Sequence, residues 1–131
     1  MKLKVPRNHI QEDMEFLYRL NNHPKIREVF FNKKFFTYEQ HKEYWKNSLE
    51  RDGFEARIIL RYDMPVGCIR RDKGIISIAI LPEHQNKGIG QEALKVFCVP
   101  GDRAEIITGN RRSFHVFIKA GFKVKNMVVE K

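Results

Sequence analysis

The sequence predicts an α+β fold, in which a mixed, mostly antiparallel sheet carries helices on its faces. Three short apolar segments, at residues 56–61, 66–70 and 75–81, follow one another with tight turns between them, as in an antiparallel meander. Segments in which apolar residues recur at helical spacing lie before and after this meander. Residues 1–131 are predicted to form one domain, because a chain of this length supports a single modest core.

The N-terminal part of the chain predicts a short edge strand and then a helix. Lys2–Val5 is the strand, and Pro6 ends it. The apolar residues of Asp13–Leu20 recur close to the helical period, and the Asn21–Pro24 segment breaks this helix. Ile26–Phe31 then continues an apolar pattern.

A second helix is predicted to begin at Thr37. Its hydroxyl and the amide of Gln40, three residues later, have the spacing of a capping box. Apolar and aromatic residues continue at helical spacing to Leu49, and the helix is expected to end before Gly53.

The segment Ile75–Phe97 predicts a strand, a glycine-containing turn and a helix. Ile75–Leu81 is nearly all apolar, which suits a strand buried on both faces, and Pro82 ends it. Gly88 and Gly90 lie where the helix begins. Glycines there let backbone N–H groups face an anion, so the expected ligand is a phosphate, with an ordinary tight turn as the alternative.

Three further elements are predicted after this helix. Ala104–Thr108 should be a strand, and a helix should run from Asn110 to Gly121, a plausible C′ glycine. Phe122–Val129 should form a final strand.

The composition indicates in which compartment the protein resides and which kinds of partner it binds. The formal net charge of +9 implies an anionic partner, which could be a nucleotide, a nucleic acid or an acidic surface, with a scattered basic surface as the alternative. Cys68 and Cys98 have no ligand spacing around them, so we expect free thiols in a reducing compartment and no metal site. The N-terminus lacks a signal-peptide apolar region, and no apolar run is long enough to cross a bilayer. We therefore expect a soluble cytoplasmic protein without a membrane partner.

Two motifs in this order resemble one enzyme family. Gln85-Asn-Lys-Gly-Ile-Gly90 fits Gln/Arg-x-x-Gly-x-Gly/Ala, and residues 110–122 fit Asn-x-x-Ala/Ser followed by Lys and then Gly-Phe. The chain resembles the GNAT-fold, acetyl-CoA-dependent N-acetyltransferases. More loosely, residues 19–24, Arg27 and His41-x-x-x-Trp45 are similar to bacterial N-acetyltransferases that act on nucleotide-linked amino sugars.

The resemblance implies that acetyl-CoA is the cofactor. Backbone N–H groups from Gln85 to Gly90 would hold its pyrophosphate, aided by the positive end of the helix and by Lys87. Asn110 would help to hold the CoA arm, although as a helix N-cap it needs no ligand. The implied cofactor-binding residues are Ile80, Leu81, Gln85, Asn86, Lys87, Gly88, Ile89, Gly90, Asn110 and Phe117.

The resemblance also implies catalytic and acceptor residues. A backbone N–H near Ile80, freed where two strands splay apart, would stabilise the oxyanion. Phe117 replaces the tyrosine that often protonates the leaving thiolate, which leaves His41 as the candidate base, directly or through water, or alternatively as a helix-surface residue. The implied acceptor site comprises Asn22, Arg27, His41 and Trp45, with a core position as the alternative for Trp45.

Compared with the family, the third helix and the C-terminal region are shortened, which would leave a sheet edge for a second subunit to cover, so we predict a homodimer. The predicted activity is acetyl transfer from acetyl-CoA to a primary amine, with a nucleotide-linked amino sugar favoured. The alternatives are a protein N-terminus, a polyamine, or a catalytically weak CoA-binding or nucleic-acid-binding module. The basic residues lack an interleaved aromatic platform, so we do not expect nucleic acid to bind.

Overall fold

The centre of the molecule is a four-stranded antiparallel sheet in the order β1-β2-β3-β4. The computed structural model describes residues 1–30 and 34–131. The strands are β1 (Lys2–Lys4), β2 (Phe54–Arg61), β3 (Met64–Asp72) and β4 (Ile75–Ile80). The predicted meander and the N-terminal edge strand are therefore confirmed.

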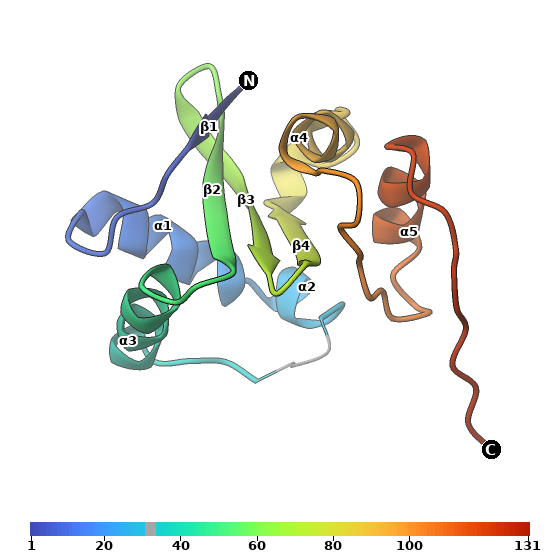
Figure 1. The fold of residues 1–131 in the computed structure, drawn as a ribbon. Helices are drawn as coiled ribbons and strands as arrows, with labels where there is room; N and C mark the ends of the chain where they lie inside the picture. Colours follow the sequence, from blue (N-terminus) through green and yellow to red (C-terminus); the bar gives the residue numbers. More distant parts are fainter. Residues whose placement is uncertain (31–33) are drawn as a thin grey trace.

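Helices cover both faces of this sheet (Figure 1). One face carries α1 (Gln11–Asn21), α2 (Pro24–Arg27) and α3 (Tyr38–Leu49), and the other carries α4 (Ile89–Phe97) and α5 (Arg111–Lys119). A 3₁₀ turn, η1 (Pro82–His84), follows β4. The capping box at the start of α3 is confirmed: the Thr37 hydroxyl accepts from the Gln40 N–H at 3.1 Å, and the Gln40 side chain accepts from the Thr37 N–H at 3.0 Å.

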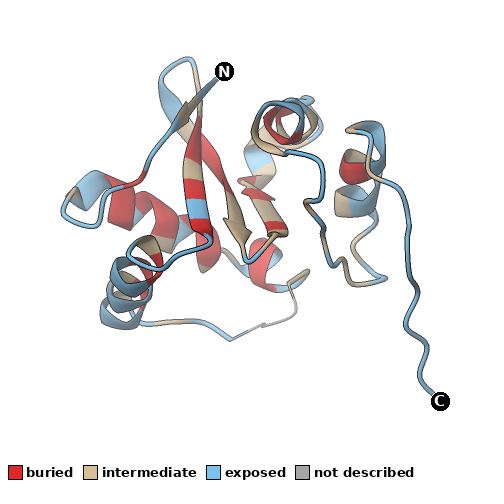
Figure 2. Ribbon diagram, viewed as in Figure 1, coloured by how far each residue is buried: buried red, intermediate tan, exposed pale blue. Residues whose placement is uncertain are grey.

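Each face of the sheet packs into its own hydrophobic core. The core beneath α1–α3 includes Met14, Leu17, Leu20, Trp45, Ile58 and Cys68. The core beneath α4 and α5 includes Ile59, Ile69, Ile76, Ala93, Leu94 and Phe117. The buried residues lie along the strands and on the helix sides that face them (Figure 2). Neighbouring strand residues such as Cys68 and Ile69 enter different cores, because successive side chains point to opposite faces.

Two predicted strands are wrong. Ala104–Thr108 forms no strand, because the segment meets β4 only at its start, where the Arg103 N–H donates to the Gly74 carbonyl at 2.9 Å and the Arg103 carbonyl accepts from the Ile76 N–H at 2.7 Å. Beyond this single parallel bridge the segment leaves the sheet. Phe122–Val129 is also no strand: Phe122 packs on the core beside Phe117, and the residues after it run away from the sheet as an exposed tail without a partner strand in the described chain (Figure 1).

The apolar segment Ile26–Phe31 was expected to continue beyond the first helix. Its beginning falls within the short α2 and its turn, and Phe31 lies outside the described residues.

A buried ion pair between Arg71 and Asp102 lies beside the point where Arg103 meets β4. Arg71 of β3 donates to both carboxylate oxygens of Asp102, at 2.8 and 2.6 Å, and to the Phe97 carbonyl at the end of α4. The Asp102 carboxylate also accepts from the Val99 N–H at 2.8 Å. The Asp102 side chain is only 4% exposed. Its hydrogen bonds with Arg71 hold the pKa of this carboxyl below its usual value.

Replacing Asp102 should therefore destabilise the fold. We expect Asp102→Ala to lower the free energy of unfolding by about 3 kcal/mol at pH 7, because it leaves a largely buried guanidinium without its main partner. The depressed pKa makes this contribution complete above the unfolded-state value of about 3.9, and it is lost as the pH falls below that value. Urea unfolding at several pH values measures the effect.

Lys2→Ala, which breaks an exposed ion pair with Asp63, is the control and should change stability by less than about 0.5 kcal/mol. Equal stabilities of wild type and Asp102→Ala at pH 7 would contradict the role given to this pair.

Candidate active site

The edge of β4 that faces away from β3 is the starting point of the site. The Ile76 N–H points to this edge, since it bonds to Arg103. In an antiparallel pair every second residue turns its N–H and C=O away from its partner strand, so the N–H groups of Ile78 and Ile80 face the same edge. Because the chain after Arg103 leaves the sheet, this edge opens into a cavity beside Ile78.

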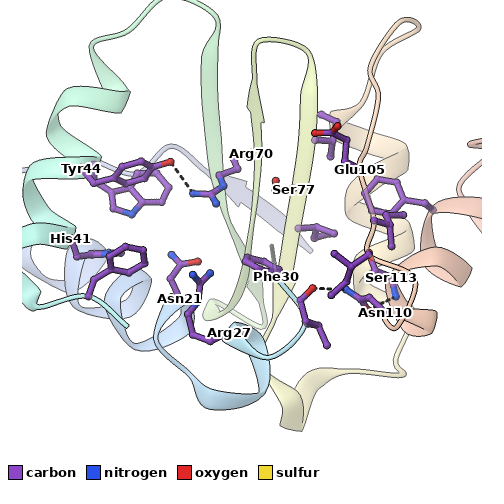
Figure 3. Close-up of a pocket in the computed structure, with 18 of the residues that line it drawn as sticks. Asn21, Arg27, Phe30, His41, Tyr44, Arg70, Ser77, Glu105, Asn110 and Ser113 are labelled. Atoms are coloured by element: carbon purple, nitrogen blue, oxygen red, sulfur yellow. Dashed lines mark hydrogen bonds between the residues drawn. The ribbon is translucent and has the colours of Figure 1, made fainter. Parts of the chain in front are cut away.

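The cavity has a volume of about 600 Å³ and lies between β4 and the segment that diverges from it. Figure 3 shows side chains converging on it from α1–α3, from β3 and β4, and from the α5 side. The polar lining residues are Asn21, Arg27, Gln40, His41, Tyr44, Arg70, Ser77, Glu105, Asn110 and Ser113.

One wall of the cavity is positively charged. Arg27 is 5% exposed, and its guanidinium lies 5.0 Å from the Phe30 ring centroid. Arg70 reaches in from β3 and donates to the Tyr44 hydroxyl at 3.2 Å (Figure 3). Burial, and then the charge of Arg70, lowers the pKa of Arg27. Among the lining residues that the structure describes, Glu105 is the single carboxylate, so the cavity favours anions.

His41 and Trp45 bring unpaired polar atoms to this wall. His41 is buried, and burial together with the charge of Arg70 lowers its pKa to about 4. Its imidazole is therefore neutral at pH 7 and a weak base, which does not support the predicted role in proton removal. Neither His41 Nε2 nor Trp45 Nε1 has a hydrogen-bond partner within the described chain. Trp45 is both a core residue and a lining residue.

Asn22 is not brought into the cavity. Its side chain instead fixes the backbone of Phe36, accepting from the N–H at 3.0 Å and donating to the carbonyl at 2.9 Å. The neighbouring Asn21 lines the cavity in its place, and its Nδ2 donates to the Leu17 carbonyl.

The predicted phosphate loop precedes α4. Gly88 is the N-cap of that helix at φ 78°, a left-handed conformation that favours glycine, and no side chain caps the helix. The N–H groups of the first helical turn, from Ile89 to Gln91, therefore keep no intrahelical acceptor. A Cβ on Gly88 would meet nothing within 4 Å, so the approach to the loop is open. With Asn86 and the exposed Lys87 preceding it, this loop fits an anion.

Gly90 also has a packing role, and Leu81 does not fit the cofactor-binding role predicted for it. A Cβ on Gly90 would lie 3.2 Å from Val116 Cγ1 of α5, so this glycine permits the close packing of α4 on α5. The Leu81 N–H donates to the Val66 carbonyl at 2.9 Å and its side chain is in the core, so it offers a cofactor no free donor. Ile89 likewise has a core side chain.

Asn110 and Phe117 border the cavity from the α5 side. The Asn110 side chain accepts from the Ser113 N–H at 3.2 Å, as a helix N-cap, and donates to the Val29 carbonyl at 3.4 Å (Figure 3). Phe117 is buried against Phe122 with the ring centroids 4.9 Å apart, and its phenyl ring has no proton to donate.

Arg70, Tyr44, Ser77 and Glu105 are lining residues that the sequence analysis missed. The sequence did carry one signal. Arg70 stands two residues after Cys68 on a strand, so it shares the inward face of that buried cysteine. A guanidinium on the inward face of a central strand indicates a binding role.

The low pKa of His41 is directly testable. We expect an NMR titration to show a neutral imidazole at pH 7 and a midpoint near pH 4, and Arg70→Ala to raise that midpoint by removing a nearby positive charge. Because the unfolded imidazole titrates near pH 6.5, this group also costs the fold stability as the pH falls from about 6.5 to 4. A midpoint near 6.5 in the folded wild type would contradict the buried setting.

No helix in the described part of the chain is long and apolar enough to cross a membrane. Residues 1–30 and 34–131 also hold no group of three or more histidine, cysteine, aspartate or glutamate side chains arranged to bind a metal ion.

Known structures share this fold. Spermidine N-acetyltransferase from Vibrio cholerae, in complex with CoA and spermine, is 17% identical, with 99% of this chain and 85% of that chain covered and a TM-score of 0.83. Aminoglycoside acetyltransferase AAC(6')-Ib with coenzyme A is 19% identical, with 97% and 86% covered and a TM-score of 0.75. No curated protein sequence matches the chain.

The family comparison covers nearly the whole chain. The model of the family described as Acetyltransferase (GNAT) domain matches residues 7–123. This span includes the loop before α4, the open edge of β4 and every residue that lines the cavity. The chain therefore belongs to the acetyltransferase (GNAT) domain family.

Proposed function

We propose that this acetyltransferase moves the acetyl group of acetyl-CoA to the primary amine of a nucleotide-linked amino sugar. The family supplies the reaction class and the co-substrate. The single observation that supports the acceptor class is the positively charged wall of the cavity, formed by Arg27 and Arg70 beside the open edge of β4. A nucleotide-linked sugar offers a diphosphate to that wall and an amine to the edge.

The residues around α4 are suited to acetyl-CoA, which supplies an activated thioester when bound. The N–H groups of Ile89, Gly90 and Gln91 would hold the diphosphate at the positive end of the helix. The Ile80 N–H faces the open edge and would donate to the oxyanion that develops on the thioester carbonyl. One such donor contributes about 3 kcal/mol to catalysis.

Proton transfers would rely little on side chains. Phe117 cannot protonate the thiolate, but a thiol with a pKa of about 8.5 leaves without much assistance. His41 is neutral and weakly basic. An acceptor amine with a lowered pKa needs less help from a base than lysine does, and this favours an amino sugar over a lysine side chain.

The positively charged wall would bind the phosphate groups of the acceptor through charge. Guanidinium groups form short, charge-assisted hydrogen bonds with phosphate oxygens, and Arg27 and Arg70 both line the cavity. The buried His41 Nε2 and Trp45 Nε1 lack partners in the described chain, so a polar acceptor would also satisfy atoms whose burial is otherwise costly. The volume of about 600 Å³ is in the range typical of small-molecule sites.

The same wall disfavours polycations. The neighbour from Vibrio cholerae was crystallised with spermine, which carries several positive charges. Such a molecule would face two guanidiniums and a single carboxylate among the described lining residues here. We therefore consider polyamines, and a protein N-terminus without an anionic group, weaker candidates for the acceptor than the nucleotide-linked sugar.

A second candidate is a CoA-binding module with weak or no catalysis. The phenyl ring of Phe117 and the low pKa of His41 favour it, because neither group can move a proton efficiently at pH 7.

An acceptor screen tests the proposal. We expect thiol release from acetyl-CoA to be fastest with nucleoside-diphosphate-linked amino sugars, compared with spermidine and N-terminal peptides. Arg70→Ala should raise KM for that acceptor about tenfold or more, because it removes a charged hydrogen-bond donor. CoA affinity should not change, since Arg70 lies away from the loop before α4. Arg61→Ala, on β2 and outside the cavity lining, is the matched control.

The outcomes separate the candidates. Fastest turnover with spermidine would overturn the acceptor class. CoA binding without thiol release for any amine would favour the non-catalytic module. An equal effect of Arg61→Ala and Arg70→Ala would show that the charged wall has no specific role.

A further inference from the structure

Arg112 of α5 is attached to the loop that precedes α4. Its guanidinium donates to Oε1 of Gln85, the first residue of the motif, and Nε2 of Gln85 donates to the Ile80 carbonyl at 2.8 Å. The Gln85 amide is therefore held at both ends. This chain of contacts joins α5, the loop and the end of β4.

A second contact places the same face of α5 beside the start of α4. Val116 follows Arg112 by four residues, so both side chains lie on one face of the helix. Val116 Cγ1 lies 3.2 Å from the position that a Cβ on Gly90 would occupy, and Gly90 is in the first turn of α4. Arg112, one turn nearer to the N-terminus of α5, contacts Gln85 in the loop that leads to the uncapped N–H groups of α4.

Arg112 also has unused binding capacity. Its side chain is exposed, and it forms no ion pair with a carboxylate in residues 1–30 or 34–131. A guanidinium has five N–H donors in a planar fork that matches phosphate oxygens. The bond to Gln85 uses few of them and fixes the orientation of the group, which lowers the entropy lost when a further partner binds.

We propose that Arg112 binds the diphosphate of coenzyme A and completes, from α5, the anion site at the start of α4. This inference rests on the proposed use of acetyl-CoA and assigns to the site a charged residue that lies outside the glycine motif. The loop supplies N–H dipoles, and Arg112 supplies a full positive charge beside them. Gln85 is accordingly a positioning residue, because it holds the guanidinium toward the loop.

The competing explanation is that Arg112 only holds the Gln85 side chain in place. That role would affect the end of β4 and hence the whole ligand, including its pantetheine arm. A phosphate contact affects only ligands that carry phosphate. Binding measured with truncated ligands therefore separates the two.

Calorimetry with coenzyme A, dephospho-CoA and pantetheine provides the test. We expect Arg112→Ala to weaken binding of coenzyme A and dephospho-CoA about tenfold to a hundredfold, and to leave pantetheine binding unchanged. Arg112→Lys should fall between wild type and Arg112→Ala, because it keeps the charge without the fork. Arg111→Ala, at the adjacent exposed position, should stay within about twofold of wild type and controls for the general effect of positive charge.

Several results would overturn the inference. If Arg112→Ala bound coenzyme A as tightly as the wild type, Arg112 would make no phosphate contact, although acetyl-CoA could still be the co-substrate. An equal loss of affinity for pantetheine would show that Arg112 only holds Gln85 in place. A loss of affinity for coenzyme A but not for dephospho-CoA would show that Arg112 contacts the 3′-phosphate and not the diphosphate. Wild-type protein that binds no coenzyme A would instead overturn the proposed function, and this inference with it.

Discussion

The single parallel bridge between Ile75 and Arg103 is the constraint on which the site depends. Continued pairing beyond this bridge would close the edge of β4. Instead they meet once and diverge, so that backbone groups of β4 face a cavity. The Arg71–Asp102 pair holds the meeting point from the adjacent strand. This ion pair lies close to the point where the cavity begins, since Arg71 is paired with Ile76, which lines the cavity.

The two cores serve different parts of the site. The helices α1–α3 pack on one face of the sheet and bring Arg27, His41 and Trp45 to the cavity, where we propose that the acceptor binds. The helices α4 and α5 pack on the other face and bring the uncapped helix start, with Arg112 beside it. The open edge of β4 lies between the two sets of residues. In the function that we propose, a thioester held from one side would meet an amine held from the other.

Local chemistry explains which elements the sequence predicted well. The capping box at Thr37 and the tight turns of the meander involve residues close in the chain, and these predictions are confirmed. The strands predicted at Ala104–Thr108 and Phe122–Val129 are wrong, because a β-forming segment becomes a strand only where the chain runs alongside a sheet edge. Ala104–Thr108 diverges from β4 after Arg103, and the C-terminal segment runs away from the sheet. The predicted homodimer, which would cover a sheet edge, stays a prediction.

The site shows the same division. The motif located the loop before α4, whose glycine at position 88 has the left-handed conformation that the turn requires. It could not show that Gly90 serves helix packing, since Val116 is distant in the sequence. Of the two arginines in the positively charged wall, Arg27 was predicted from the family resemblance and Arg70 was not. The position of Arg70 beside the cavity depends on the register of β3 against β4. The low pKa of His41 follows from burial and from Arg70, and neither is visible in a helical pattern.

The most direct test of this account is a titration of isotope-labelled protein with coenzyme A, followed through backbone amide resonances. We expect the largest shift changes at Ile78, Ile80 and residues 89–91, whose N–H groups face the open edge of β4 or begin α4. The amides of β1 and of the hairpin between β2 and β3 should stay unchanged. Shift changes confined to other surfaces, or none at all, would contradict it.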